Sequence, residues 1–382
     1  MRNDSVWRPR WHQRVPLVRD AREALRSAFF RTLGAIARTD DARSILNASV
    51  GDLARWRPAV PHAAAVGLPA PYPELGRETA TDAVAGRKAI FITARFRSGS
   101  TLLWNIFRHV DGCTAYYEPL NERRWFDASH RGLRTDPTHH DVDNYWMEYD
   151  GLERLGAHYH EDWIRHRLYM DEQSWDPDLV QYVRILAEGA RARPVLQFNR
   201  IDFRLAWFRH NFREASLIHL YRNPRDQWCS TFRHGQSCPP DAGIAEFANY
   251  DGFYLLPWAT DLKYRFPFLD PATVAHPYRL FYYIWKLSYW WGASYAHHSL
   301  SYEALVASPE WELRRLFQAI GIADVDWPAL VGLVVPAPRR WPSYAPDAWF
   351  RKHEEACEEV LADFFSSGAL PAAATAQAHM AM

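Results

Sequence analysis

The sequence predicts an α/β protein: a three-layer α/β/α core around a mostly parallel sheet, with a helical N-terminal preface and helical insertions. Three observations predict this fold. From residue 88 onward, short apolar stretches alternate with segments of helical periodicity, a pattern typical of parallel strands joined by helices. The first apolar stretch runs through a glycine-containing loop directly into a helical segment. Two aromatic-rich segments, near 120–190 and 235–298, are too long for plain loops, and we expect partly helical insertions that cover the carboxyl edge of the sheet.

The individual elements are expected in an alternating order along the chain. Each predicted strand is a short apolar run rich in β-branched or aromatic residues, and each predicted helix repeats apolar residues at three and four residue steps. The expected strands are 88–94, 114–119, 194–198 and 216–221, and the expected helices are 101–109, 203–213 and a segment that begins near 225.

Two regions of different character divide the chain. Residues 1–86 are predicted to be a helical N-terminal extension and linker, and residues 87–382 the main domain. The periodicity over 17–57 indicates helix. The stretch 58–86 is dense in Pro, Ala and Gly, which is typical of an irregular linker.

The composition excludes several classes of protein. The chain has 382 residues, of which 48% are hydrophobic and 24% charged, as in a globular protein with a real core. Its formal charge is zero at pH 7, so no nucleic-acid partner is indicated and any anion site must be built locally. We find no apolar stretch long enough for a signal peptide or a membrane span. We therefore expect a cytoplasmic protein; the Ala, Arg and Trp bias points to a bacterial source, and the oligomeric state stays open.

Cysteine, histidine and aromatic usage predicts no metal site. The four cysteines form no CxxC pair or zinc spacing, so we expect free thiols. The string HYHEDWIRH (158–166) is neither HExxH nor joined to cysteines, and is expected to be a histidine-rich surface. The 18 tryptophans and 19 tyrosines are expected to fill the core more than to line a sugar-binding cleft.

A loop with the features of an anion site follows the first strand. Arg97, Ser98, Gly99, Ser100 and Thr101 join KAIFITA to the helical segment LLWNIF. A helix N-terminus offers unpaired amides and the positive end of its dipole, and glycine lets the backbone approach an anion closely. Arg97 adds a charge-assisted contact, and the hydroxyls add donors. The setting is P-loop-like, but the loop lacks the glycine spacing and the lysine of GxxxxGK[ST], which disfavours ATP with magnesium.

A later strand and helix are predicted to reach the same edge of the sheet. The string SLIHLYRNPRDQWCS places Arg222 at a strand end, Pro224 at a helix start and Ser230 two turns further on. Because parallel strands open their carboxyl ends on one edge, Arg222 and Ser230 are expected to turn toward the anion loop. Taken singly, the two residues fit a surface salt bridge and helix packing equally well.

Together with SYEALVASPEWELRRLFQAIGI (301–322), these strings resemble the sulfotransferases that use 3′-phosphoadenosine 5′-phosphosulfate (PAPS). In that family, the loop matched by Arg97 to Thr101 holds the 5′-phosphosulfate, and the arginine and serine matched by Arg222 and Ser230 hold the 3′-phosphate. The third string resembles the family's Tyr-Glu-x-Leu strand and a following helix that begins at proline and ends at glycine. The resemblance implies transfer of a sulfuryl group from the co-substrate PAPS to an acceptor hydroxyl, without a metal.

The sequence departs from the family at one place. The cytosolic branch has a C-terminal Arg-Lys-Gly stretch that helps to hold the 3′-phosphate, and no such stretch occurs here. Arg339 and Arg340 are the nearest basic pair.

Glu118 is the predicted catalytic base. It follows the expected strand in TAYYEPL, and a right-handed crossover makes that strand parallel to the first, so Glu118 opens on the same edge. The string resembles the Phe/Tyr-Glu-Pro-Leu segment of the carbohydrate sulfotransferases, and tyrosylprotein sulfotransferases use a glutamate at a similar distance as base. Glu118 would take the acceptor proton while Arg97 stabilises the leaving phosphate. The alternative is a structural carboxylate paired with Arg97 or Arg123.

Other candidate residues remain open. Histidine is the base in the cytosolic branch, although none of the histidines here lies in a matching motif; the candidates are His109, His130, His139 and His140. Asn199 and Arg200 end the string LQFNR on the same edge, where either would touch sulfate or acceptor, unless Arg200 only pairs with Asp202.

The expected acceptor is a carbohydrate or glycolipid hydroxyl, with a phenol or a tyrosyl peptide as alternatives. Two other functions compete with sulfuryl transfer. A P-loop-like kinase or phosphotransferase would need a metal-binding carboxylate beside a Lys-Ser/Thr loop. A non-catalytic nucleotide-binding module would not need Glu118.

Overall fold

The computed structural model describes residues 28, 29, 32, 88–132, 135–136, 139–232 and 237–366. All described residues from 88 onward belong to one compact unit, Pro69–Met382. Ala28, Phe29 and Thr32 are helical, as expected for 17–57, and the rest of the predicted N-terminal extension and linker lies outside the described residues. The predicted domain boundary near residue 87 therefore stays a prediction.

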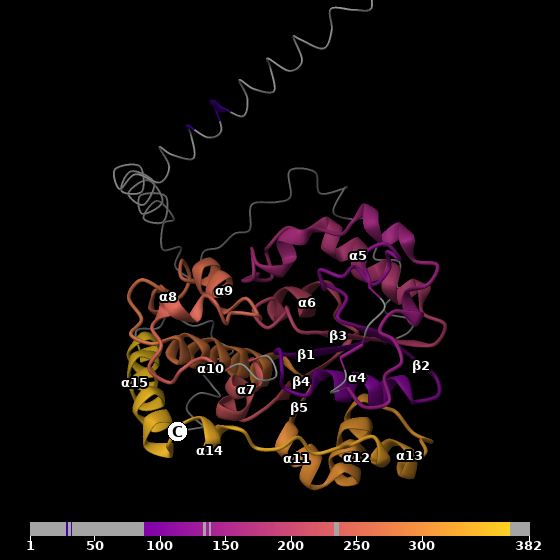
Figure 1. The fold of residues 1–382 in the computed structure, drawn as a ribbon. Helices are drawn as coiled ribbons and strands as arrows, with labels where there is room; N and C mark the ends of the chain where they lie inside the picture. Colours follow the sequence, from indigo (N-terminus) through magenta and orange to yellow (C-terminus); the bar gives the residue numbers. More distant parts are fainter. Residues whose placement is uncertain are drawn as a thin grey trace, which may run out of the picture. The chain divides into compact units, whose positions relative to one another are not determined.

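A parallel sheet forms the centre of this unit (Figure 1). Its strands among the described residues are β1 (Ile90–Ala94), β2 (Cys113–Tyr117), β3 (Arg193–Phe198), β4 (Ser216–Tyr221) and β5 (His298–Ser301). They lie in the order β2-β3-β1-β4-β5, and each neighbouring pair is parallel. Every residue of β1 is buried, as expected for a central strand covered on both faces. The predicted α/β class with a parallel sheet is confirmed.

Helices cover both faces of the sheet. On one face α4 (Ser100–Arg108) packs against β2 and α12 (Pro309–Ile320) against β5; on the other, α5 (Pro177–Gly189) packs against β3 and α10 (Pro277–Tyr295) against β4. Figure 1 shows α4 and α12 below the sheet and α5 and α6 above it. The other described helical elements are α6 (Leu205–Asn211), α7 (Pro224–Ser230), α8 (Ile244–Phe247), α9 (Leu255–Leu262), α11 (Tyr302–Ala307), α13 (Trp327–Gly332), α14 (Trp341–Tyr344), α15 (Asp347–Ser366), and the 3₁₀ turns η1 (Met147–Tyr149), η2 (Glu153–Ala157), η3 (Glu161–Ile164) and η4 (Pro267–Leu269).

Two sequence expectations need correction. The insertions do more than cover the sheet edge, because they contain α5 and α10, which pack on the face of the sheet. The Tyr-Glu-x-Leu string is not a strand: β5 ends at Ser301, whose Oγ accepts the N–H of Ala304 as a helix cap, and Tyr302 begins α11. The next helix, α12, begins at Pro309 and ends before Gly321 in the left-handed conformation, as expected.

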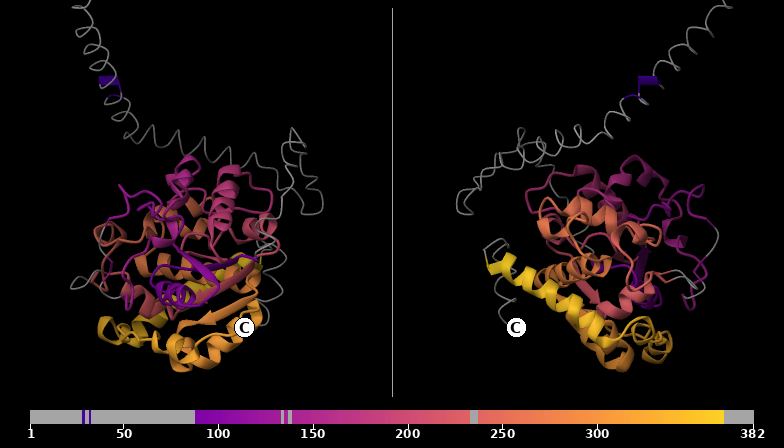
Figure 2. Two further views of the ribbon diagram at one scale, coloured as in Figure 1. Left: turned by 90° about the vertical axis from the view of Figure 1, so that its right-hand side faces the viewer. Right: turned by 60° about the vertical axis from the view of Figure 1, so that its left-hand side comes forward.

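The C-terminal helix α15 runs along α10 and fixes the position of α7 (Figure 2). From α10, the Tyr278 hydroxyl donates to Glu354 at 2.7 Å. From α7, the Arg225 guanidinium donates to both oxygens of Glu354, at 2.8 and 2.6 Å. A bidentate pair of this kind favours one orientation of a helix, so α7, which carries Ser230, is fixed against α15.

The aromatic residues and cysteines are mostly internal. Six tryptophans are fully buried among the described residues: Trp104, Trp163, Trp207, Trp228, Trp258 and Trp291. The four cysteines are free thiols, as expected.

No helix in the described part of the chain is long and apolar enough to cross a membrane.

Candidate active site

The loop between β1 and α4 has the backbone shape of an anion cradle. Arg97 and Gly99 both have positive φ, 65° and 94°, and Gly99 caps α4 without a side-chain hydrogen bond. The first backbone N–H groups of a helix have no partner within the helix, so those at the start of α4 are available to an anion. A Cβ on Gly99 would lie 2.5 Å from Cδ2 of Tyr302, so only glycine fits at this position. The Tyr302 ring therefore packs directly against the loop at Gly99.

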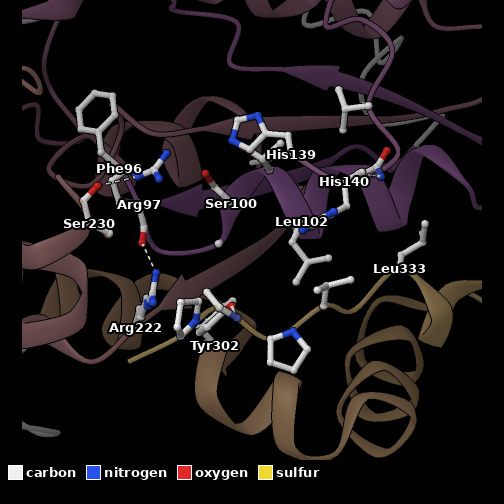
Figure 3. Close-up of a pocket in the computed structure, with 18 of the residues that line it drawn as sticks. Phe96, Arg97, Ser100, Leu102, His139, His140, Arg222, Ser230, Tyr302 and Leu333 are labelled. Carbon is white, nitrogen blue, oxygen red and sulfur yellow. Dashed lines mark hydrogen bonds between the residues drawn. The ribbon is translucent and has the colours of Figure 1, made fainter. Parts of the chain in front are cut away.

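The predicted site residues gather around one cavity of about 450 Å³ (Figure 3). The predicted residues that line it are Arg97, Gly99, Ser100, Thr101, Glu118, Arg222 and Ser230. Ser98 is the exception: it is buried inside the loop, where its N–H and hydroxyl both donate to the Arg95 carbonyl, at 3.2 and 2.7 Å. The Ser98 hydroxyl thus holds the loop in shape.

Arginines concentrate positive charge at one end of the cavity. Arg97 Nε donates to the Ser230 carbonyl at 2.9 Å, and Arg222 Nη1 donates to the Arg97 carbonyl at 3.2 Å. Burial lowers the pKa of Arg97, and the positive charges of Arg340 and Arg222 act in the same direction. The negative charge of Asp136, 3.8 Å from the guanidinium, opposes this shift. Arg222 Nε is buried and has no hydrogen-bond partner among the described residues. Repelling cations with unused donors favour a bound anion between them.

Arg340 joins this cationic end through two long-range hydrogen bonds that position its segment. The Tyr302 hydroxyl accepts the N–H of Ala337 at 3.0 Å, and Asp226 Oδ1 accepts the N–H of Arg340 at 2.8 Å. The segment 333–340 is thereby held as one wall, and Arg340 lines the cavity. Its neighbour Arg339 is exposed and outside the lining. The sequence singled out this pair only as the nearest basic residues and gave no way to choose between them.

Glu118 lines the cavity on the side of β2, just beyond its end. The residue is buried, has a φ of 41° and accepts a hydrogen bond from Asn121 Nδ2. Burial raises the pKa of its carboxyl, and the positive charge of Arg200 opposes that rise. The partner of Glu118 is Arg200, at 3.6 Å, and not Arg97 or Arg123.

Arg200 pairs with Glu118 and Glu122, and not with Asp202. Its Nη2 donates to Glu122 at 2.6 Å, and Nη1 donates to the Asn199 side chain. Asp202 is paired with Arg95 instead, at 3.4 Å. Neither Asn199 nor Arg200 lines the cavity, so Arg200 acts on the site through Glu118.

Of the four candidate histidines, His139 and His140 line the cavity and the others do not. His139 Nδ1 is 2.6 Å from the Tyr145 hydroxyl, and burial lowers the pKa of its imidazole to about 4, so it is neutral at pH 7. His130 pairs with Asp127 on an exposed loop. Next to Glu118, the Tyr117 hydroxyl lies 3.0 Å from Thr101 Oγ1, which links the Glu118 side of the cavity to the loop that begins α4.

Two further observations bear on cofactor and acceptor chemistry. In the described ranges, no group of three or more His, Cys, Asp or Glu side chains is placed to hold a metal ion. His158 and His160, from the histidine-rich string, both contact Asp178 at 2.9 Å. Among the described residues that line the cavity there is no tryptophan.

Comparison with known proteins assigns the chain to a family. The model of the sulfotransferase family matches residues 89–327, more than half of the 382-residue chain. The protein belongs to the sulfotransferase family. A comparison with curated proteins found no match. Among solved structures, the chain is similar to a sulfotransferase from Mycobacterium tuberculosis, with 13% identity and a TM-score of 0.38 over 71% of this chain and 77% of the other.

Proposed function

We propose that the protein transfers the sulfuryl group of PAPS to an acceptor hydroxyl, with Glu118 as general base. The observation that carries the proposal is the convergence of Arg97, Arg222 and Arg340 with the glycine loop on a cavity that also contains Glu118. A donor with phosphates at two positions needs two anion sites, and a transfer reaction needs a base beside one of them.

The donor phosphates are assigned to the two parts of the cationic end. The amides at the start of α4, with the hydroxyls of Ser100 and Thr101, would hold the 5′-phosphosulfate, and Arg97 would carry the charge of its bridging oxygen. Arg222, Ser230 and Arg340 would hold the 3′-phosphate, with the unused Nε of Arg222 as one donor. Arg340 takes the place that the cytosolic enzymes give to their Arg-Lys-Gly stretch.

The chemical step uses residues of this chain only. Glu118 accepts the proton of the acceptor hydroxyl while the oxygen of that hydroxyl attacks the sulfur of PAPS. The bond between sulfur and the bridging oxygen breaks, and its electron pair leaves on adenosine 3′,5′-bisphosphate, where Arg97 and the α4 amides stabilise the charge. The raised pKa of the Glu118 carboxyl makes it a stronger base than an exposed glutamate. These contacts supply the positive charge that a metal ion supplies to magnesium-dependent phosphotransferases.

The proposed acceptor is a hydroxyl of a carbohydrate or glycolipid. This proposal rests on the resemblance of residues 117–120 to the carbohydrate branch, because the described residues that line the cavity include Phe96, Phe253 and Tyr302 but no tryptophan.

Calorimetry with adenosine 3′,5′-bisphosphate, AMP and magnesium ATP tests the donor assignment. We expect tight binding of the bisphosphate and much weaker binding of the other two, because only the bisphosphate satisfies both anion sites. Equal affinity for AMP and the bisphosphate would remove the 3′-phosphate site. Preference for magnesium ATP would point to a phosphotransferase.

A further inference from the structure

Asn105 has a polar atom that the protein itself leaves unused. It lies on α4, is 2% exposed, and lines the cavity. Its Nδ2 donates to the backbone carbonyls of His140 and Asp141, at 3.3 and 3.4 Å. Its Oδ1 is buried and has no hydrogen-bond partner among the described residues. A buried acceptor without a partner is costly, so a donor is expected to satisfy it when the cavity is filled.

The orientation of the Asn105 amide is fixed by its surroundings. Both neighbours of Nδ2 are carbonyl oxygens, which accept hydrogen bonds and cannot donate them. Rotating the amide by half a turn would place Oδ1 against these two oxygens and lose both hydrogen bonds. Oδ1 is therefore the atom that remains for a ligand. Because Oδ1 itself has almost no exposed surface, a ligand must offer it an N–H or O–H group as the Asn105 side chain turns toward the cavity.

Asn105 belongs to the end of the cavity that lies away from the arginines. It follows Leu102 by one helical turn and bonds to the backbone of His140. Figure 3 shows Leu102, His140 and Leu333 on the side opposite to Arg97, Arg222 and Ser230. This end combines apolar side chains, Leu102 and Leu333, with one unpaired acceptor.

We propose that Asn105 determines the nucleobase specificity of the donor site, by accepting a hydrogen bond from the exocyclic amine of adenine at Oδ1. The proposal rests on the proposed function, which puts the phosphates of the nucleotide at the cationic end. A purine ring then extends toward Leu102 and Leu333, which pack on its apolar faces, and presents its edge to Asn105. Guanine and hypoxanthine carry a carbonyl oxygen where adenine carries the amine, so they set an acceptor against an acceptor.

The size of the cavity favours one nucleotide over a nucleotide and a whole acceptor. Its volume of about 450 Å³ lies at the lower end of the range for pockets that enclose a single small-molecule ligand. The acceptor then needs to bring only its hydroxyl to Glu118. Asn105 is then available to contact the adenine of the donor nucleotide.

Calorimetry with two nucleotides tests the proposal directly on the wild-type protein. Adenosine 3′,5′-bisphosphate and inosine 3′,5′-bisphosphate differ at two adjacent atoms: in inosine a carbonyl oxygen replaces the 6-amine, and N1 carries a hydrogen. We expect the adenosine compound to bind about ten- to a hundredfold more tightly, the usual worth of a hydrogen bond with an otherwise unpaired buried group. In Asn105→Leu, which keeps the number and branching of the side-chain heavy atoms but removes the Oδ1 acceptor and the two Nδ2 hydrogen bonds, affinity for the adenosine compound should fall and the preference should disappear.

The outcomes separate this inference from the function on which it rests. Equal binding of the two nucleotides by the wild type, or an unchanged preference in Asn105→Leu, would overturn the role of Asn105 and leave the donor site intact. A rise in acceptor KM without a change in nucleotide affinity would assign this end to the acceptor, against the proposal. Binding of neither bisphosphate would overturn the proposed function and this inference with it. The wild-type comparison needs no variant, so it decides the matter even if Asn105→Leu fails to fold.

Discussion

The guanidinium of Arg200 lies 3.6 Å from the carboxylate of Glu118. Arg97, in the anion loop, donates a hydrogen bond to the Ser230 carbonyl and is not a partner of Glu118. Glu118 is therefore paired with Arg200, which follows β3, and not with an arginine proposed to hold the donor. This arrangement allows catalysis and donor binding to be altered separately.

Glu118→Gln should lower turnover about 10²–10⁴-fold, the usual contribution of a general base, because the amide keeps the shape of the side chain and loses its basicity. Affinity for adenosine 3′,5′-bisphosphate should hardly change. Steady-state kinetics and calorimetry on the same variant measure the two effects. Glu122→Gln is a matched control. Glu122 is the closer carboxylate partner of Arg200, at 2.6 Å, but it does not line the cavity, so this variant removes a charge beside Arg200 without touching the proposed base. Near-normal turnover in Glu118→Gln would move the search for the base to His139 and His140.

The activity should also depend on pH through Glu118. A base must be deprotonated, and burial raises the pKa of this carboxyl above its ordinary value of 4.5, so kcat/KM should fall as pH drops through that raised pKa. Arg200 opposes the rise, and its removal in Arg200→Met should move the acidic limb of the profile to higher pH. Arg123→Ala, at an exposed position, should leave the limb in place. A limb that does not move in Arg200→Met would contradict the coupling.

Arg340 and Arg339 form a natural pair of variant and control. Arg340→Ala and Arg222→Ala should each weaken binding of adenosine 3′,5′-bisphosphate by about 2–5 kcal/mol, because a phosphate charge loses its partner in a half-enclosed site. Binding of AMP should change far less. Arg339→Ala removes the same charge from an exposed position outside the cavity and should have little effect. Similar losses in Arg339→Ala and Arg340→Ala would indicate a general field effect instead of a built site.

Comparing Gly99→Ala with Gly112→Ala distinguishes the effect of backbone strain from the effect of a steric clash. Both have positive φ, 94° and 83°, so alanine at either position costs about 1–2 kcal/mol of stability. A Cβ on Gly112 meets nothing within 4 Å, whereas one on Gly99 meets the Tyr302 ring at 2.5 Å. Gly99→Ala should therefore lower the melting temperature more than Gly112→Ala, and it alone should weaken nucleotide binding. Calorimetry that finds intact binding in Gly99→Ala would show that the anion loop does not depend on this close packing.

Local pattern was enough to predict the parallel sheet and part of the cavity lining. KAIFITA, SLIHLY and the glycine loop are contiguous strings whose apolar periodicity and turn chemistry do not depend on distant residues. Arg222 and Ser230 could be anticipated because a strand end and the first helix after it open on the same edge of a parallel sheet. The helical start of α11 was missed because the cap at Ser301 competes with continuation of the strand.

Residues placed by long-range contacts could not be predicted in the same way. Arg340 reaches the cavity because Asp226, 114 residues earlier, accepts its backbone N–H. Arg200, just beyond β3, meets Glu118, just beyond the neighbouring strand β2, although 82 residues separate them in the sequence. Asn105 stands out only when the carbonyls that occupy its Nδ2 and the missing partner of its Oδ1 are both known. Each of these depends on tertiary pairing, which leaves no local pattern in the sequence.

The most direct test of the central claim follows labelled sulfur. PAPS carrying an isotope of sulfur is incubated with the protein, an extract of its source and EDTA, and the products are analysed by mass spectrometry. We expect the label in a covalently sulfated product with release of adenosine 3′,5′-bisphosphate, no loss of transfer caused by EDTA, and almost no product with Glu118→Gln. Binding of PAPS without transfer of the label, or a metal-dependent transfer of phosphate from ATP in its place, would contradict the account.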